Sequence, residues 1–461
     1  MTKRCRPQFL IFLSVAVVVQ TSILVVVVQN PAASRTAQLN LAAIRDAGDS
    51  SQRESGEIRA LQQQAPIPLS TSSISASTAA FTTSTLSTTG SSSATSSSVE
   101  TPTIQVDPST PANLAQLTLA GQPYEAVGVN AYEIASLYGV NAGCGPMLTD
   151  AQLDQFFASL PPHSLVRFSA FQGGLATNVT NHLLDWFPID RVFRAAAAYG
   201  QYLIPVLTGQ GGYCDGQHWQ DPSWYDGGFN QVFNLSANSD GQGLDPLSYW
   251  DYIQEIVNRY KNSPALGMWE PVSEADPETC PIQNEGVNCT CPNETAAALA
   301  LHHFFDVVGG EIHSLDPNHL VESGLEGGGQ CGTAGFDYDY VSSSPGIDVM
   351  SFHDYYGATD PLGGPPGNDV ATRLAEAAAL GKPIIGGEIG IQAGTGPNCM
   401  SDAQRATAVA TVSQTLYASG ASGLLWWDWV PSLSQPCNWD IAPGDPILST
   451  LASLATASNR S

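Results

Sequence analysis

The segment Asp369-Val-Ala-Thr-Arg-Leu-Ala-Glu-Ala-Ala-Ala-Leu-Gly-Lys-Pro-Ile-Ile-Gly-Gly-Glu388 contains a helix pattern, a stop and a strand pattern in succession. Residues 369–380 favour a helix, and Gly381 follows where a left-handed residue commonly ends one. Residues 383–388 form a short apolar run that is typical of a buried strand. A helix followed directly by a strand is the repeating unit of an α/β fold.

The same alternation extends from about residue 112 to the end of the chain. Before the run at 266–271, apolar residues recur at helical spacing, and Ser401 is placed to cap a helix that runs towards Gly420. The eight candidate strands are 126–130, 165–168, 203–208, 266–271, 320–324, 348–353, 383–388 and 423–427. Continuous apolar runs suit parallel strands that are buried on both faces. The pattern therefore predicts an α/β fold, a (β/α)8 TIM barrel, with a doubly wound sheet as the alternative.

The region before the barrel has a different composition. Residues 3–6 read Lys-Arg-Cys-Arg, and the uncharged run 9–28 follows, so residues 1–34 are predicted to be a signal peptide or a retained signal anchor. Residues 71–100 contain twenty Ser or Thr and no apolar periodicity. We therefore expect a disordered Ser/Thr-rich linker at 35–111 and a TIM-barrel domain at 112–461, outside the cytoplasm in either case.

Eight of the nine cysteines lie in the predicted barrel, at positions 144, 214, 280, 289, 291, 331, 399 and 437. An even number after an export signal predicts four disulfides, although spacing alone leaves the pairing open. Free core thiols are one alternative. A zinc site at Cys280, Cys289 and Cys291 is another, but no His lies close to them in sequence.

The charge distribution limits the possible ligands. The net charge is −26, and seven of the sixteen Lys and Arg residues lie before residue 60. The main body therefore lacks the cationic surface on which nucleic-acid binding depends. A neutral ligand suits it better, and no cofactor motif is present.

Polar and aromatic residues stand at the ends of the candidate strands, where a TIM barrel forms its active site. Among them are Glu274 and Glu388, which are 114 residues apart, or three units of 38. This spacing places them on strands four and seven. Glycosidic bond cleavage needs two carboxyl groups, and a separation of about 5 Å makes the enzyme retaining. Glu388 would then be the nucleophile and Glu274 the acid/base.

From about residue 115 to its end, the chain resembles clan A glycoside hydrolases of the family 5 type, within the β-mannanase and cellulase group. The resemblance begins with the opening segment 117–132, which is similar to that group's first hairpin and strand. The other residues that carry it, in chain order, are Arg167, Glu274, His353 and Tyr355 of a His-x-Tyr motif, Glu388 and Trp427. The resemblance implies a barrel hydrolase that acts on a β-linked polysaccharide or oligosaccharide, β-mannan or β-glucan above all.

The resemblance also implies roles for the residues around the two glutamates. Arg167 and Tyr355 are expected to contact Glu388, with Arg167 lowering its pKa. His353 is expected to touch the sugar, although a satisfied core histidine is the alternative. Trp427 is expected to be the stacking floor beneath the reacting sugar. Glu274 must begin protonated, so a raised pKa is expected for it.

One position departs from the family pattern. The family has Asn immediately before the acid/base, where this chain has Ser273. That Asn normally donates a hydrogen bond to the sugar 2-hydroxyl, and a serine hydroxyl is shorter but can also donate. Two nearby carboxylates compete with Glu274 for the acid/base role. Of these, Glu270 should lie a layer lower in the barrel and Glu278 lies in the following loop.

Further aromatic residues are candidates for sugar stacking, although each is individually expected to be packing: Trp219, Trp224, Tyr225, Trp426 and Trp429. Asp428 could reach a sugar hydroxyl, but packing is again the preferred interpretation.

The sequence thus predicts a retaining glycosidase that is monomeric and needs no metal or cofactor. It is expected outside the cell, either secreted or anchored to the membrane through residues 9–28. Two alternatives stay open. One is a non-catalytic or weakened carbohydrate-binding protein on the same barrel, supported by Ser273. The other is a metal-dependent barrel hydrolase, for which only His353 and Asp354 offer clustered ligands.

Overall fold

The computed structural model describes residues 102–109, 115–211, 214, 219–232, 245–281, 288–355, 358–396, 399–433 and 436–458. The predicted signal segment at 1–34, its apolar run and most of the predicted linker lie outside these residues. Among the described residues, no helix is both long enough and apolar enough to cross a membrane.

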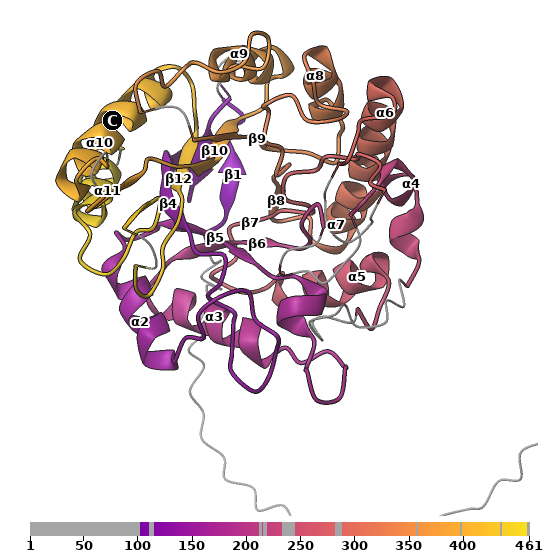
Figure 1. The fold of residues 1–461 in the computed structure, drawn as a ribbon, viewed down its shortest axis with the longest axis horizontal. Helices are drawn as coiled ribbons and strands as arrows, with labels where there is room; N and C mark the ends of the chain where they lie inside the picture. The colour runs from indigo at the N-terminus through magenta and orange to yellow at the C-terminus, as the bar shows by residue number, and fades with distance from the viewer. Residues whose placement is uncertain are drawn as a thin grey trace, which may run out of the picture. The chain divides into compact units, whose positions relative to one another are not determined.

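Eight parallel strands form the centre of the fold (Figure 1). In chain order they are β4 (Ala126–Asn130), β5 (Leu165–Ser169), β6 (Tyr202–Val206), β7 (Met268–Trp269), β8 (Leu320–Val321), β9 (Met350–Asp354), β10 (Ile384–Ile389) and β12 (Gly423–Trp426). All eight correspond to the strands predicted from the apolar runs, with ends shifted by a few residues. The predicted TIM barrel is confirmed.

The strand pairing closes the barrel. Six strands pair in the order β6-β5-β4-β12-β10-β9, and β7 pairs with β8. The parallel bridges Leu203↔Leu266 and Val206↔Glu270 connect β6 to the β7 segment, and Glu322↔Val349 connects the β8 segment to β9. The residues of all eight strands are buried except His353, which is partly buried, because helices cover the outer face and side chains fill the interior.

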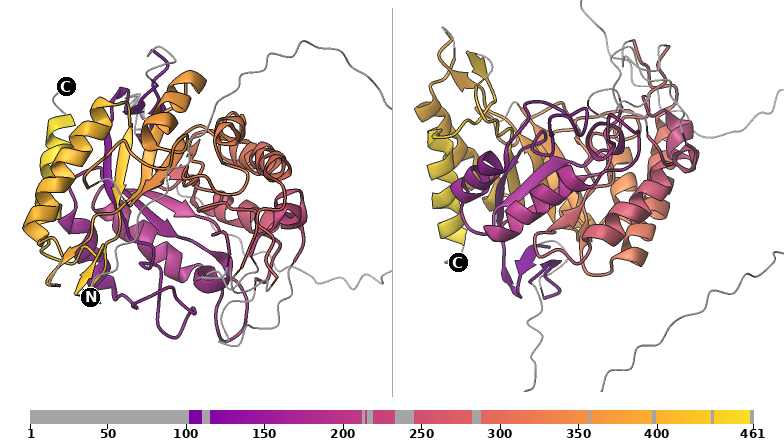
Figure 2. Two further views of the ribbon diagram at one scale, coloured as in Figure 1. Left: turned by 45° about the horizontal axis from the view of Figure 1, so that its top comes forward. Right: turned by 90° about the horizontal axis from the view of Figure 1, so that it is seen from below.

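Helices surround the strands (Figures 1 and 2). The α-helices are α2 (Asp150–Ser159), α3 (Phe187–Ala198), α4 (Pro222–Tyr225), α5 (Tyr249–Tyr260), α6 (Glu294–Phe304), α7 (Gly310–Leu315), α8 (Phe336–Ser342), α9 (Val370–Leu380), α10 (Asp402–Ala418) and α11 (Pro446–Ser458). Shorter turns are η2 (Gln172–Ala176), η3 (Gly228–Asn230) and η4 (Phe305–Gly309), of which η4 joins α6 to α7.

The helix signals in the sequence have the expected local causes. Asp369 caps α9 through the Thr372 backbone N–H, and Gly381 ends it with φ of 68°. Ser401 forms a capping box with Gln404 at the start of α10, which ends at Ala418, slightly before the expected Gly420. In α5 the apolar positions at helical spacing face the barrel, with Ile253, Ile256, Val257 and Tyr260 buried and Trp250 partly buried.

A small antiparallel sheet closes the N-terminal end of the barrel. It contains β1 (Ile104–Val106), β2 (Leu117–Leu119) and β3 (Gln122–Pro123). Ile104 and Leu117 pack against residues at the beginnings of the barrel strands, including Leu165, Met268 and Leu425. Ordered structure therefore begins before the predicted domain boundary at residue 112, because β1 gains both a pairing partner and a buried side chain from the barrel.

Four disulfides link all eight barrel cysteines, as the even count predicted. The pairs are Cys144–Cys214, Cys280–Cys289, Cys291–Cys331 and Cys399–Cys437. The zinc and free-thiol alternatives are therefore wrong for these residues. The first pair joins the loop after β4 to the loop after β6, and the last joins the loop after β10 to the loop after β12. These two bonds therefore tie together loops that follow the C-terminal ends of the barrel strands.

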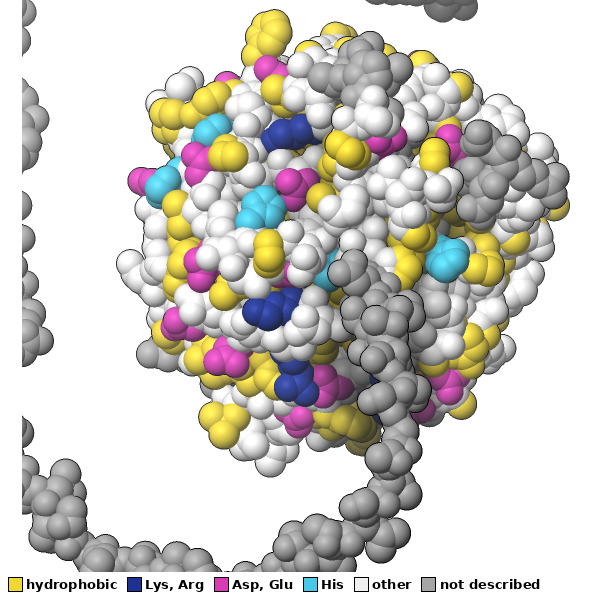
Figure 3. All heavy atoms as spheres, turned by 180° about the vertical axis from the view of Figure 1, so that it is seen from behind, with side chains coloured by type: hydrophobic (Ala, Val, Ile, Leu, Met, Phe, Trp, Pro, Cys, Tyr) yellow, Lys and Arg dark blue, Asp and Glu magenta, His cyan; other side chains and the backbone are white. Residues whose placement is uncertain are grey.

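Basic side chains do not gather on the face seen in Figure 3, where Lys and Arg lie scattered among acidic and apolar groups.

We predict that removing the Cys144–Cys214 bond lowers stability more than removing Cys280–Cys289. The bonds close separations of 70 and 9 residues, and the loop-entropy difference between such lengths is about 2 kcal/mol. Urea unfolding of the Cys144→Ser/Cys214→Ser and Cys280→Ser/Cys289→Ser double variants would measure both losses. Equal losses would contradict this expectation.

Candidate active site

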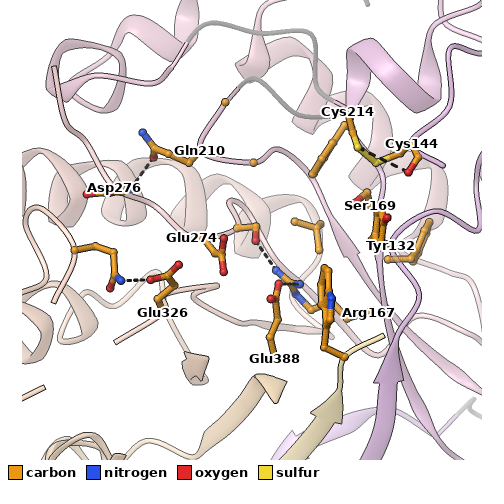
Figure 4. A pocket seen from close by; sticks show the side chains of 18 of the residues that line it. Tyr132, Cys144, Arg167, Ser169, Gln210, Cys214, Glu274, Asp276, Glu326 and Glu388 are labelled. Carbon is orange, nitrogen blue, oxygen red and sulfur yellow. Dashed lines mark hydrogen bonds and ion pairs between the residues drawn. A yellow bond between two sulfur atoms is a disulfide. The ribbon is translucent and has the colours of Figure 1, made fainter. Parts of the chain in front are cut away.

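A cavity of about 770 Å³ opens at the C-terminal ends of the barrel strands (Figure 4). Six of the seven predicted site residues line it: Arg167, Ser273, Glu274, Tyr355, Glu388 and Trp427. The seventh, His353, lies just beneath the surface, with 2% of its side chain exposed. The structure therefore brings together residues that are spread over 260 positions of the chain.

Arg167, on β5, lies at the centre of the polar network. Its guanidinium is 2.6 Å from Glu388 Oε1 and donates two hydrogen bonds of 2.6 Å to the Glu270 carboxylate. It also donates to Asn130 Oδ1 at 3.0 Å and to Ser273 Oγ at 2.6 Å. The side chain is buried, so these partners replace the water that a guanidinium needs. The predicted contact between Arg167 and Glu388 is confirmed.

Glu270 lies beneath the site, as its position four residues before Glu274 predicted. It is fully buried, and it holds Arg167 through a bidentate pair, so it has no access to the cavity. Glu322, which follows β8, lies beside Glu270, and burial raises the pKa of Glu322 well above its usual value. A protonated Glu322 can therefore donate a hydrogen bond to Glu270, and the two carboxyl groups avoid sharing two negative charges.

Glu388, on β10, is buried and accepts two strong hydrogen bonds. Arg167 donates to one carboxylate oxygen at 2.6 Å, and the Tyr355 hydroxyl donates to the other at 2.5 Å. Burial raises the pKa of Glu388, whereas the charges of His353 and Arg167 and the Tyr355 hydrogen bond oppose the rise. The predicted lowering by Arg167 is thus present, but burial outweighs it. The two donors orient the carboxylate towards the cavity.

Glu274 follows the β7 segment in a rare backbone conformation. Its φ is 55°, a value that residues with a side chain seldom adopt outside strained functional positions. The Glu274 N–H donates to the Gly324 carbonyl at 2.8 Å, and His353 Nδ1 lies 2.8 Å from Glu274 Oε1. Both contacts fix the carboxyl at the cavity, where 39% of the side chain is exposed.

The electrostatic state of Glu274 differs from the expectation. Burial raises the pKa of Glu274, but the hydrogen bond and the charge of His353, with Arg167, outweigh burial and lower it to about 2. For His353, burial disfavours the charged form and so lowers the pKa, but the negative charges of Glu388 and Glu274 outweigh burial and raise it to about 9. The predicted raised pKa for Glu274 is therefore wrong for the unliganded protein, because a protonated histidine lies against the carboxylate.

The two glutamates lie close together. One ligand atom each from Glu274, His353 and Glu388 lie within 4.8 Å of one another. Retaining glycosidases have carboxyl groups about 5–5.5 Å apart, whereas inverting enzymes need about 6.5–9.5 Å for an intervening water. The observed separation corresponds to the retaining arrangement.

Trp427 follows β12 and lies at the cavity with its ring stacked on Tyr132, at a centroid distance of 5.3 Å and an angle of 1° between the rings. Tyr355 contacts the same tryptophan edge to face at 6.4 Å. A partly exposed ring that is held in this way offers a flat apolar surface to a sugar.

The other aromatic candidates divide clearly. Trp219 lines the cavity. The other four are buried, which agrees with the prediction that each is a packing residue: Trp224, Tyr225, Trp426 and Trp429.

Sequence reasoning missed several residues of the cavity. Glu326 and Gln330 come from the loop after β8, Asp276 from the loop after β7, Tyr132 from the loop after β4 and Trp439 from the loop after β12. The position of Glu326 in the sequence could have identified it, since it follows the fifth strand as Glu274 follows the fourth. Nothing in the sequence identified the other four residues, because tertiary contacts decide the conformation of the loops that carry them.

Two groups of side chains in the described part of the chain bring three potential metal ligands together. In one of them, Cys291 and Cys331 are joined by a disulfide, so they offer no thiolate. The other is Glu274, His353 and Glu388. There the pKa of His353 is raised to about 9 despite burial, by Glu388 and Glu274. A metal ion bound here would have to displace the proton of His353, in a site where the Arg167 guanidinium already lies against Glu388.

No protein-family model matches the chain. Among curated proteins, it is 30% identical over 189 residues to a probable mannan endo-1,4-beta-mannosidase C of Aspergillus terreus, covering 37% of this chain and 42% of that protein. It is 30% identical over 261 residues to the mannan endo-1,4-beta-mannosidase A of Podospora anserina, covering 53% and 60%. The chain thus spans about half the length of the curated relatives that it matches.

Solved structures share the fold. An endo-1,4-beta-mannanase from Rhizomucor miehei matches with a TM-score of 0.54 at 20% identity, over 77% of this chain and 99% of that one. A glycoside hydrolase family 5 mannosidase from the same organism matches with a TM-score of 0.53 at 16% identity, over 78% and 98%. Sequence and fold together confirm the resemblance to clan A glycoside hydrolases of the family 5 type.

Asp428, next to Trp427, is buried with 4% exposure and does not line the cavity. Burial raises its pKa to about 7, and the charges of Asp440 and Glu388 add to the rise. An unfolded aspartate ionises near pH 4. Between about pH 4 and 7 the folded protein therefore binds more protons here than the unfolded chain does.

It follows that Asp428 makes the free energy of unfolding fall as the pH rises through this range, by up to about 1.4 kcal/mol per pH unit. We predict that Asp428→Asn flattens this dependence, whereas Asp154→Asn, at an exposed position on α2, leaves it unchanged. Urea unfolding at several pH values between 4 and 7 tests both. A wild-type slope in Asp428→Asn would contradict the assignment.

Proposed function

We propose that the protein is a retaining glycoside hydrolase that cleaves β-linked mannan through Glu388 and Glu274. The observation that carries the proposal is the carboxyl pair within 4.8 Å at the mouth of the barrel, with Arg167 and Tyr355 both directed at Glu388. A binding protein needs sugar-contacting groups but has no use for two opposed carboxyl groups at this separation.

In the proposed reaction, Glu388 attacks the anomeric carbon while Glu274 protonates the departing glycosidic oxygen. The bond from the anomeric carbon to that oxygen breaks as the bond to Glu388 forms. A water then transfers a proton to Glu274, attacks the anomeric carbon and releases Glu388. Arg167 and the Tyr355 hydroxyl hold the nucleophile in place, and Trp427 supports the reacting ring.

Two sources support the choice of substrate. The proteins with similar sequences are named mannan endo-1,4-beta-mannosidases, and matching structures are named mannanases. The cavity is also open and aromatic at Trp219, Trp427 and Trp439, which suits an uncharged chain of sugars. β-Glucan is the second candidate because the resemblance includes the cellulases.

The setting of the enzyme belongs to the same proposal. Four disulfides suit an oxidising compartment, so we place the barrel outside the cytoplasm, as a monomer on the Ser/Thr-rich segment. Residues 1–34 would direct export, with cleavage or anchoring through 9–28 as the two outcomes.

The assignment of the glutamates is tested by one variant and by one covalent label. Glu274→Ala should lower mannan hydrolysis by about 100- to 10,000-fold, because general acid catalysis contributes that much. It should keep cleavage of a dinitrophenyl β-mannoside, whose leaving group needs no proton, and azide should restore turnover. A 2-fluoro-mannosyl fluoride should label Glu388 in the wild type.

Full mannan hydrolysis by Glu274→Ala, or labelling at another residue, would exclude this mechanism. Failure of the label to react at all would support the carbohydrate-binding alternative. Loss of activity in a chelator would instead support the metal-dependent alternative.

Ser273 is proposed to contact the sugar 2-hydroxyl while Arg167 donates to it, which leaves the serine hydrogen free for the substrate. Ser273→Ala should lower kcat/KM by about tenfold, the value of one hydrogen bond of about 1.4 kcal/mol. A 2-deoxy substrate should show no such loss. An equal loss on both substrates would mean that Ser273 acts only by holding Arg167.

A further inference from the structure

The cavity contains a third carboxyl group that the double-displacement reaction does not use. Glu326 follows β8 and lines the cavity beside Glu274 (Figure 4), and its side chain is within hydrogen-bonding reach of the Glu274 carboxyl group. Its backbone carbonyl accepts a hydrogen bond of 2.9 Å from the His353 N–H, and Gln330 Nε2 donates to its Oε2. Glu326 is therefore fixed on both sides rather than free in solvent.

Two carboxyl groups can form a hydrogen bond with each other only if one of them carries a proton, because carboxylate oxygens are acceptors alone. The Glu274–Glu326 contact thus implies one proton in the pair. The neighbouring charges decide where it resides. His353 lies against Glu274, at 2.8 Å, and stabilises its ionised form, whereas the partner of Glu326 on its other side is the neutral Gln330.

We propose that Glu326 stores the proton that Glu274 delivers to the departing glycosidic oxygen. This inference rests on the proposed function and identifies Glu326 as a positioning residue that acts through Glu274. In the first step the Glu326 O–H bond breaks and its proton moves to the ionised Glu274 carboxylate, which passes this same proton to the leaving oxygen and is left ionised again. In the second step the proton that Glu274 takes from water returns to Glu326.

The charges around the pair agree with this assignment. Glu274 faces Arg167 and His353, which favour its ionised form, and the acidic side chains of Asp276, Glu326 and Glu388. Tyr355 faces it as a neutral phenol, because burial and the Glu388 charge raise the pKa of Tyr355. Burial, the charge of Glu274 and that of Glu388 raise the pKa of Glu326 to about 8, against an opposing effect of His353.

A proton store of this kind explains how the acid can work although its own pKa is lowered. With His353 beside it, Glu274 alone would lose its proton well below neutral pH. Because Glu326 retains the proton, the pair as a whole keeps it until the solution reaches about pH 8. The histidine can therefore orient Glu274 without leaving the site short of a proton.

The test is the pH profile of Glu326→Gln, which keeps the shape of the side chain and removes the store. We expect the alkaline limb of kcat/KM on mannan to move to lower pH by at least one unit. Activity at pH 7 should fall more than tenfold, while cleavage of a dinitrophenyl β-mannoside should change less than twofold. Glu278→Gln is the matched control, because Glu278 does not line the cavity, and it should leave the profile unchanged.

An alkaline limb of Glu326→Gln that coincides with the wild type would overturn the proposal, as would equal losses on both substrates. A second measurement does not depend on activity. The infrared difference spectrum of wild type minus Glu326→Gln at pH 7 should contain the carbonyl band of a protonated carboxyl group, and its absence would also overturn the proposal. A wild type that hydrolyses neither mannan nor glucan would refute the proposed function, and this spectrum would still report on the shared proton.

Discussion

The buried ion pairs of Arg167 are the constraint on which the rest of the site depends. A guanidinium inside a barrel must have its donors satisfied, and this one is surrounded by Glu270, Glu388, Asn130 and Ser273. Removing either carboxylate would leave buried N–H donors of the guanidinium without an acceptor. The arginine therefore fixes the heights of β5, β7 and β10 relative to one another at the mouth of the barrel.

The two glutamates differ in burial and in the groups that hold them. Glu388 is buried, and Arg167 and Tyr355 hold both of its oxygens. Glu274 is partly exposed and held by His353 and a strained backbone. A nucleophile gains from a fixed orientation, whereas an acid/base must exchange protons with the substrate and with water. The unequal burial of the pair thus matches the two roles proposed for it.

The barrel also contains more carboxyl groups than cations can neutralise. Protonation resolves part of this excess, because burial and a neighbouring carboxylate raise the pKa of Glu322, beside Glu270, and of Glu326, beside Glu274. The pKa of Asp428 is likewise raised to about 7 by burial and by its acidic neighbours Asp440 and Glu388. The proposed proton storage at Glu326 and the pH-dependent stability at Asp428 therefore have the same physical cause, which is the burial of acidic groups close to one another.

The sequence by itself determined the fold and most of the site. Apolar runs such as 126–130 and 383–388 identified the strands, since short continuous apolar runs between helical segments suit parallel strands that are buried on both faces. Because parallel strands place their carboxyl ends together, the residues that follow them, from Arg167 to Trp427, were expected in one place, and they are. The even cysteine count likewise predicted four bonds but not their pairing.

Only the tertiary structure decided the electrostatics. The sequence predicted a raised pKa for Glu274 from its expected role as the acid, but the geometry placed His353 at 2.8 Å and reversed the direction. It also brought Glu326 to Glu274 across 52 positions of the chain, and it placed β1 beneath the barrel where a linker was expected. Strand patterns depend on neighbours in sequence, whereas a pKa depends on charges a few ångströms away in space, which the order of residues does not record.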